Sequence, residues 1–126
     1  MKAWIPITLL VALGAAAHAR ADCSYPMAPA NPPDGATATR DEMLAAKHDF
    51  DRYNGEMNTY LDCLKLETNN VVPKDMSKLS PDEKKKVEEK AKVLAQKNNA
   101  AVDELQAVVG RFNEQLKIYK AHQAKP

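Results

Sequence analysis

The sequence predicts an all-α protein: an antiparallel two-helix hairpin, coiled-coil-like, with an N-terminal extended strap that is disulfide-linked to it. Two long segments repeat apolar residues at steps of three and four, which is typical of packed helices. A proline-rich stretch precedes them, and the chain has only two cysteines. In chain order we expect a signal peptide at 1–21, a Pro-rich strap at 22–38 and a helical hairpin domain at 39–126.

The first 21 residues have the layout of an export signal. Lys2 gives a positive start, Ile5 to Ala17 form a mostly apolar run, and Ala19-Arg20-Ala21 is a small-x-small cleavage pattern. The alternative is an uncleaved anchor, but the run is shorter than the roughly 20 apolar residues that span a bilayer. Asp22 argues against a lipoprotein cysteine at Cys23. We therefore expect a periplasmic or secreted protein with no stable membrane insertion after signal cleavage.

The charge of the mature chain is close to neutral. Loss of Lys2 and Arg20 lowers the formal net charge from +1 to about −1. Nucleic acids and anionic membranes call for a clear basic excess. Neither partner is expected.

Cys23 and Cys63 are predicted to form a structural disulfide, because an even cysteine count in an exported chain favours pairing. Their spacing is unlike Cys-x-x-Cys, and neither His48 nor His122 lies near a cysteine in sequence. In the chain-entropy model, closing this loop stabilises the fold by roughly 4 kcal/mol. A disulfide between two chains is the alternative, and the sequence does not decide between them.

The strap cannot be helix or central strand, because it is crowded with prolines. Asp34-Gly35 indicates a turn near its end. At about 3.1 Å per residue, the strap is long enough to run back along the first helix to Cys63. Tyr25 and Met27 are then expected to cover apolar surface of the hairpin.

The first helix is expected at about 39–68. Thr39 and Glu42 form a capping box at its start, and the helix is expected to end before Pro73. His48 falls on the outward side. The predicted packing seam of this helix includes Phe50, Tyr53, Met57, Tyr60 and Leu64.

The second helix is expected at about 80–121. Ser80 is a capping residue and Pro81 occupies the first helical position. Asn98 falls on the seam, where a buried asparagine fixes register by pairing with a polar partner. The predicted seam of this helix includes Leu94, Asn98, Leu105 and Phe112.

The sequence contains no recognisable catalytic arrangement. It lacks a Gly-x-Ser-x-Gly elbow and a glycine-rich phosphate loop. A two-helix hairpin also offers few cavities of the size that small ligands need. We expect no enzyme activity, no cofactor and no metal.

Several short motifs resemble those of an uncharacterised family of small exported helical proteins of Gram-negative bacteria. The chain has a looser likeness to the Spy/CpxP-type periplasmic chaperones, without their paired Leu-Thr-x-x-Gln motifs. The family resemblance implies a periplasmic helical protein and no catalytic residues. The motifs that carry it are Cys23, Pro33-Asp34-Gly35, Glu42-Met43, Tyr60-Leu61-Asp62-Cys63-Leu64, Asn99-Ala100-Ala101-Val102-Asp103-Glu104 and Phe112-Asn113-Glu114-Gln115.

These observations favour a periplasmic structural or protein-interaction module whose specific role the sequence does not give. The expected partners are another protein or a second copy of the chain. The alternative is a holdase-type periplasmic chaperone, because methionine-bearing helices suit varied clients.

Overall fold

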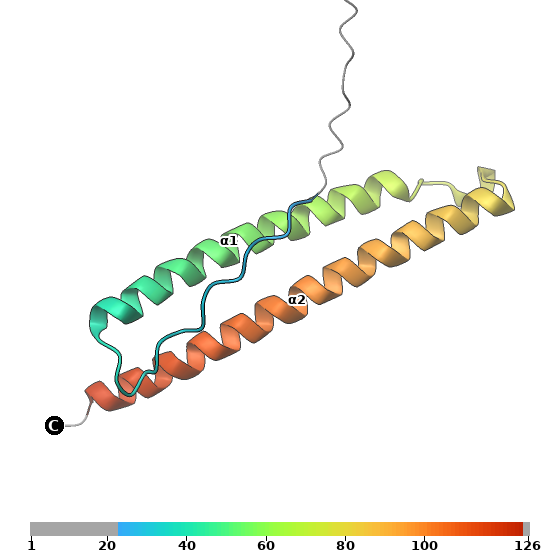
Figure 1. Cartoon of the computed structure of the whole chain (residues 1–126). Helices are drawn as coiled ribbons and strands as arrows, with labels where there is room; N and C mark the ends of the chain where they lie inside the picture. Colours follow the sequence, from blue (N-terminus) through green and yellow to red (C-terminus); the bar gives the residue numbers. More distant parts are fainter. Residues whose placement is uncertain (1–22, 125–126) are drawn as a thin grey trace, which may run out of the picture.

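The computed structural model describes residues 23–124 of the chain. The predicted signal peptide lies outside them. A strap at 23–38 precedes helix α1 (Arg40–Val71), a short 3₁₀ helix η1 (Met76–Lys78) and helix α2 (Pro81–Gln123). Figure 1 shows α1 and α2 lying antiparallel, with the strap running back between them. The predicted all-α hairpin is confirmed.

Helix α1 begins where the sequence places a capping box. Thr39 Oγ1 accepts a hydrogen bond from the Glu42 N–H, and Glu42 Oε2 accepts one from the Thr39 N–H. These hydrogen bonds hold the pKa of Glu42 below its usual value. The helix ends at Val71, three residues beyond the expected end at 68, because Val71 packs against the core. Val72 is extended, as the residue before Pro73 prefers.

Helix α2 runs without interruption for 43 residues, or about 65 Å. Ser80 and Glu83 form its capping box and Pro81 sits at its start. It ends at Gln123, two residues beyond the expected end at 121. The connection from α1 contains η1, which Asp75 caps by accepting hydrogen bonds from Ser77.

The core lies along the line where the two helices meet. Phe50 and Phe112 stack across it, with ring centroids 5.0 Å apart. Phe50 and Leu105 are half-buried but pack against the core cluster. The buried side chains are Met43, Tyr53, Met57, Tyr60, Leu64, Leu94, Ala101, Val108 and Phe112.

Asn98 is half-buried at the edge of this seam. The expected role in fixing register requires a hydrogen bond from the Asn98 side chain to a polar group of α1. Within residues 23–124 no such hydrogen bond is present. Asn98 lines a hollow with Leu61 and Thr68 instead.

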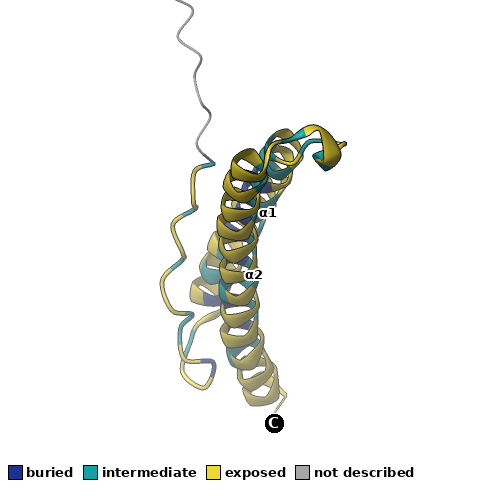
Figure 2. Ribbon diagram, turned by 90° about the vertical axis from the view of Figure 1, so that its right-hand side faces the viewer, coloured by how far each residue is buried: buried dark blue, intermediate teal, exposed yellow. Residues whose placement is uncertain are grey.

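The strap forms a thin third layer on one side of the helix pair (Figure 2). Its burial repeats every three residues: Cys23, Pro26, Pro29 and Pro32 are half-buried and Gly35 is buried. Pro33 is the one half-buried residue off this spacing. Three residues per turn is the period of a polyproline II helix, so one edge of the strap faces the helices.

The expectation that Met27 covers the hairpin is wrong. Met27 is 84% exposed, whereas Tyr25 is 51% exposed and its ring meets Tyr60. The strap repeats its orientation every three residues. Met27 directly follows the inward-facing Pro26 and therefore points away from the helices.

Candidate interaction groove

The strap lies in a groove between α1 and α2, which we call the strap groove. Its floor carries the aromatic side chains of the seam, and its walls are polar. The groove residues that line hollows beside the strap are Glu42, Ala45, Ala46, Asp49, Phe50, Glu56, Thr59, Tyr60, Cys63, Val108, Arg111 and Phe112.

One end of the strap is fastened covalently. Cys23 and Cys63 form a disulfide within the chain. Next to it, the Tyr25 ring meets the Tyr60 ring edge to face, with centroids 5.0 Å apart. The disulfide borders a hollow of about 400 Å³ that Cys23 and Cys63 both line.

The other end of the strap is fastened by a close backbone approach at Gly35. The Gly35 N–H donates to Gln115 Oε1 at 2.8 Å. A Cβ on Gly35 would lie 2.1 Å from the Gln115 carbonyl oxygen and 2.7 Å from the Tyr119 nitrogen. Gly35 has no positive φ, so glycine is required here by space and not by backbone conformation.

A turn built by Asp34 then directs the chain into α1. The Asp34 carbonyl accepts hydrogen bonds from the Thr37 and Ala38 N–H groups, and Asp34 Oδ1 accepts one from the Ala36 N–H. The predicted turn at Asp34-Gly35 is thus part of a structure that also sets Gly35 against α2.

The strap fills the middle of its groove poorly. A hollow of about 290 Å³ lies between strap residues Pro29 and Pro32 and the stacked rings of Phe50 and Phe112. Arg111 and Asp49 stand at its margin. Such a gap leaves the groove atoms without part of the contact that a closely packed interior provides.

The Tyr53 hydroxyl is the one buried side-chain polar atom without a hydrogen-bond partner among the described residues. Its side chain is fully buried. Burial raises the pKa of Tyr53 to about 12, with further contributions from the neighbouring Tyr25 and Glu104. Tyr25 belongs to the strap, and its side chain interacts with the Tyr53 hydroxyl and helps to raise its pKa, although the two groups do not reach the geometry of a hydrogen bond.

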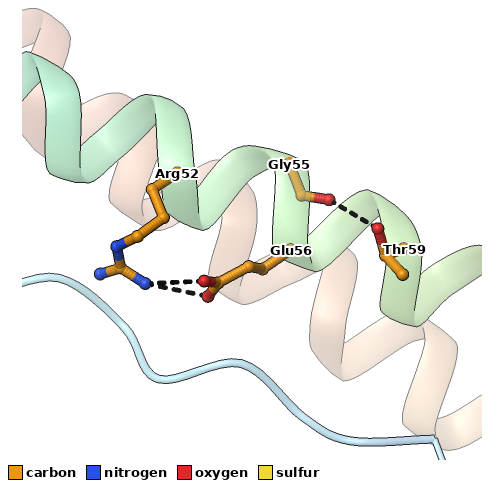
Figure 3. Close-up of polar contacts among 4 residues, drawn as sticks. All are labelled: Arg52, Gly55, Glu56 and Thr59. Carbon is orange, nitrogen blue, oxygen red and sulfur yellow. Dashed lines mark hydrogen bonds and ion pairs between the residues drawn. The ribbon is translucent and has the colours of Figure 1, made fainter.

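Ion pairs border the groove on α1. Arg52 Nη1 donates to both carboxylate oxygens of Glu56, at 3.0 and 2.9 Å, and Figure 3 shows both side chains projecting toward the strap. One turn along, Thr59 Oγ1 donates to the Gly55 carbonyl. Exposed pairs of this kind contribute little to stability, about 0.3–0.5 kcal/mol for an i,i+4 pair. They make this wall of the groove polar.

Beyond Cys23 the same side of the hairpin continues without a covering segment from residues 23–124, as what we call the open groove. Val71 and Leu94 lie in it, and Val93 is 50% exposed there. Its margin carries charges of both signs, from Glu67 and Glu89 and from Lys86 and Lys90. The hollow measures about 380 Å³.

The structure brings together the predicted disulfide and most of the predicted seam. Tyr53, Tyr60, Phe50 and Phe112 lie under the strap, and Leu94 lies in the open groove. His48 is exposed, as expected. Sequence reasoning did not find the inward-facing prolines. The three-residue spacing from Cys23 through Pro26, Pro29 and Pro32 to Gly35 was the available signal.

The described residues hold no group of three His, Cys, Asp or Glu side chains placed to share a metal ion. None of the helices within residues 23–124 has the length and apolar character needed to cross a membrane.

Comparison with protein-family models, with curated proteins and with solved structures gives no match. The resemblance to small exported helical proteins stays a prediction.

Proposed function

We propose that the protein is an extracytoplasmic structural or protein-interaction module that docks a partner in its open groove. The observation that carries this proposal is the half-exposed apolar strip at Val93, on the side of the hairpin that the strap covers elsewhere. The covered part of the groove needs a third element to complete it. The open part has the same two helices and lacks that element.

An amphipathic helix suits the open groove best. The groove lies between two helices, and a third helix buries an apolar stripe against such a surface with its i, i+3, i+4 side chains. Glu67, Glu89, Lys86 and Lys90 flank the apolar strip, so a partner helix with both charge signs on its margins finds complementary groups. The proposal gives the protein a binding role and no catalysis.

The compartment is part of this proposal. The Cys23–Cys63 disulfide is consistent with an oxidising, extracytoplasmic compartment. A periplasmic or secreted location rests in addition on the predicted export signal.

Site-specific photocross-linking tests the docking site in cells. A photoreactive phenylalanine at Val93 is expected to cross-link one discrete partner, and the same residue at Gly110 is the control, because a side chain there meets nothing within 4 Å. Light scattering of the purified protein identifies the partner as a second copy if the mass doubles. Equal, diffuse cross-linking from both positions contradicts the proposal.

A holdase role is the second candidate, and exposed apolar side chains on other parts of the surface favour it. Leu44, Leu66 and Ile118 are 51%, 65% and 36% exposed. A holdase suppresses aggregation of an unfolded client, and Val93→Glu is expected to leave that effect largely intact while it abolishes co-purification of a discrete partner bound in the open groove. No suppression at several-fold molar excess rules the role out.

A further inference from the structure

We propose that the strap groove is itself a binding site for an extended, proline-rich peptide of a partner protein, which the chain's own residues 23–35 occupy while the Cys23–Cys63 disulfide is intact. This site is distinct from the open groove. It takes a different ligand, an extended peptide in place of a helix.

The first argument is the way in which the strap is seated. Inward-facing residues recur at every third position, from Cys23 through Pro26, Pro29 and Pro32 to Gly35. A polyproline II ligand presents one edge to its receptor with this period, and it loses little conformational entropy on binding because proline preforms it. The strap therefore contacts the hairpin as a peptide ligand contacts a receptor.

The second argument is the chemistry of the groove. Proline-rich peptides dock in aromatic-lined grooves. Here Tyr60 meets the strap at Tyr25, and the Phe50 and Phe112 rings face Pro29 and Pro32 across the central hollow. Aromatic side chains of the hairpin therefore lie beside all three inward-facing prolines: Tyr60 beside Pro26, and Phe50 and Phe112 beside Pro29 and Pro32.

The third argument is that the strap is an imperfect occupant. It leaves the hollow of about 290 Å³ above Phe50 and Phe112, and it leaves the buried Tyr53 hydroxyl without a partner. A partner peptide with a larger inward-facing side chain beside Phe50 and Phe112 fills more of that space. A peptide with a carbonyl oxygen within reach of Tyr53 satisfies the hydroxyl, since an unpaired buried donor is costly.

Release of the strap needs one chemical step. A dithiol reductant supplies two electrons and two protons, so that the Cys23–Cys63 bond becomes two thiols while the reductant becomes a disulfide. The hollow beside the disulfide gives such a reductant access. After reduction, the Gly35 contact and the partial burial of the prolines remain to hold the strap.

The test uses the whole chain with a protease site placed in the exposed turn at Ala36-Thr37. Cleavage leaves the strap attached only through its groove contacts and the disulfide. A fluorescent peptide with the sequence of Ser24 to Gly35 is then added, and its anisotropy reports binding. We expect binding after reduction and none before it, while circular dichroism confirms that the hairpin stays helical.

A matched variant of the peptide sharpens this measurement. Exchanging Pro29 with Ala30 in the peptide keeps its composition and breaks the three-residue spacing, which is expected to weaken binding about tenfold. Equal affinity of the original and spacing-broken peptides, or no binding to the folded, reduced protein, overturns the proposal.

A second measurement covers the case in which the cleaved protein unfolds. In the intact chain with Cys63→Ser, a fluorophore on Cys23 reports whether the strap lies in its groove. An excess of unlabelled peptide with the sequence of Ser24 to Gly35 is expected to displace the strap and lower the anisotropy of the label, and the spacing-broken peptide is not. No displacement by either peptide at millimolar concentration contradicts an exchangeable site.

Discussion

The two halves of the hairpin are built from the same two helices but are held together differently. The strapped half comprises residues 40–63 of α1 and 95–123 of α2, and the strap, the disulfide and most buried side chains belong to it. The open half comprises residues 64–71 and 81–94, where only Leu64 and Leu94 are buried.

The difference shows what two helices can and cannot do alone. A helix pair buries one narrow stripe, and a domain this small needs further elements to complete a core. The strapped half receives a third layer and a crosslink. The open half is instead stabilised by local helix caps: the Ser80–Glu83 capping box with Pro81, and the Asp75 cap of η1. Its apolar strip is left for a partner.

Removing the disulfide is expected to give the largest effect. In the Cys23→Ser/Cys63→Ser double variant, loss of a crosslink across a sequence separation of 40 is expected to lower the free energy of unfolding by about 4 kcal/mol. Urea unfolding measures this. Hydrogen exchange is expected to speed up more in residues 40–63 than in residues 81–94. If the free energy of unfolding falls by less than about 1 kcal/mol, or if hydrogen exchange speeds up equally in both halves, the disulfide does not stabilise the strapped half selectively.

Truncating one core side chain in each half comes next. Met57→Ala is expected to cost about 3 kcal/mol, because Met57 is fully buried and its removal leaves a cavity. Leu94→Ala is expected to cost about 2 kcal/mol, since the open groove beside it lets water enter the space. Thermal and urea unfolding of both variants give the comparison. A larger loss for Leu94→Ala would mean that the open half is the better packed one.

Adding a methyl group at a glycine tests the non-covalent end of the strap. Gly35→Ala is expected to cost about 2 kcal/mol, because the Cβ would meet the Gln115 and Tyr119 backbone atoms. Gly55→Ala and Gly110→Ala are matched controls in open positions on α1 and α2, and each is expected to stabilise the protein by up to about 1 kcal/mol. The same sign at all three positions would contradict the close approach of Gly35 to α2.

The smallest expected effect concerns the hydroxyl beneath the strap. Tyr53→Phe removes a buried group without a partner and is expected to raise the free energy of unfolding at pH 7 by about 1 kcal/mol. The pKa of Tyr53 is raised to about 12, so the stability linked to its neutral form is present below pH 10 and is lost as the pH rises through 12.

Ultraviolet absorbance of the tyrosines follows this titration. Tyr53→Phe is expected to remove the step near pH 12 and to lessen the alkaline loss of stability. Tyr119→Phe changes the tyrosine count equally and serves as the control, because Tyr119 is only half-buried. A destabilised Tyr53→Phe variant would show that the hydroxyl has a partner in solution.

Much of the fold follows from local signals in the sequence. Thr39 with Glu42 and Ser80 with Glu83 place both helix starts, because a capping box is formed by residues three apart. The end of α1 was expected too early, at residue 68, because Val71 is held by packing against the core that the position of Pro73 does not reveal. Met27 was misplaced because the strap was treated as a ribbon without a period.

The sequence by itself determined the two helices, their caps and the pairing candidates Cys23 and Cys63, since hydrogen bonds between near neighbours and a count of two cysteines suffice for these. The tertiary structure alone decided that the bond lies within one chain, that Gly35 meets Gln115 and that Tyr53 lies unpaired beneath the strap. The strap and α2 lie about 80 residues apart in the chain, so where their atoms meet depends on how both helices pack, which short-range patterns do not encode.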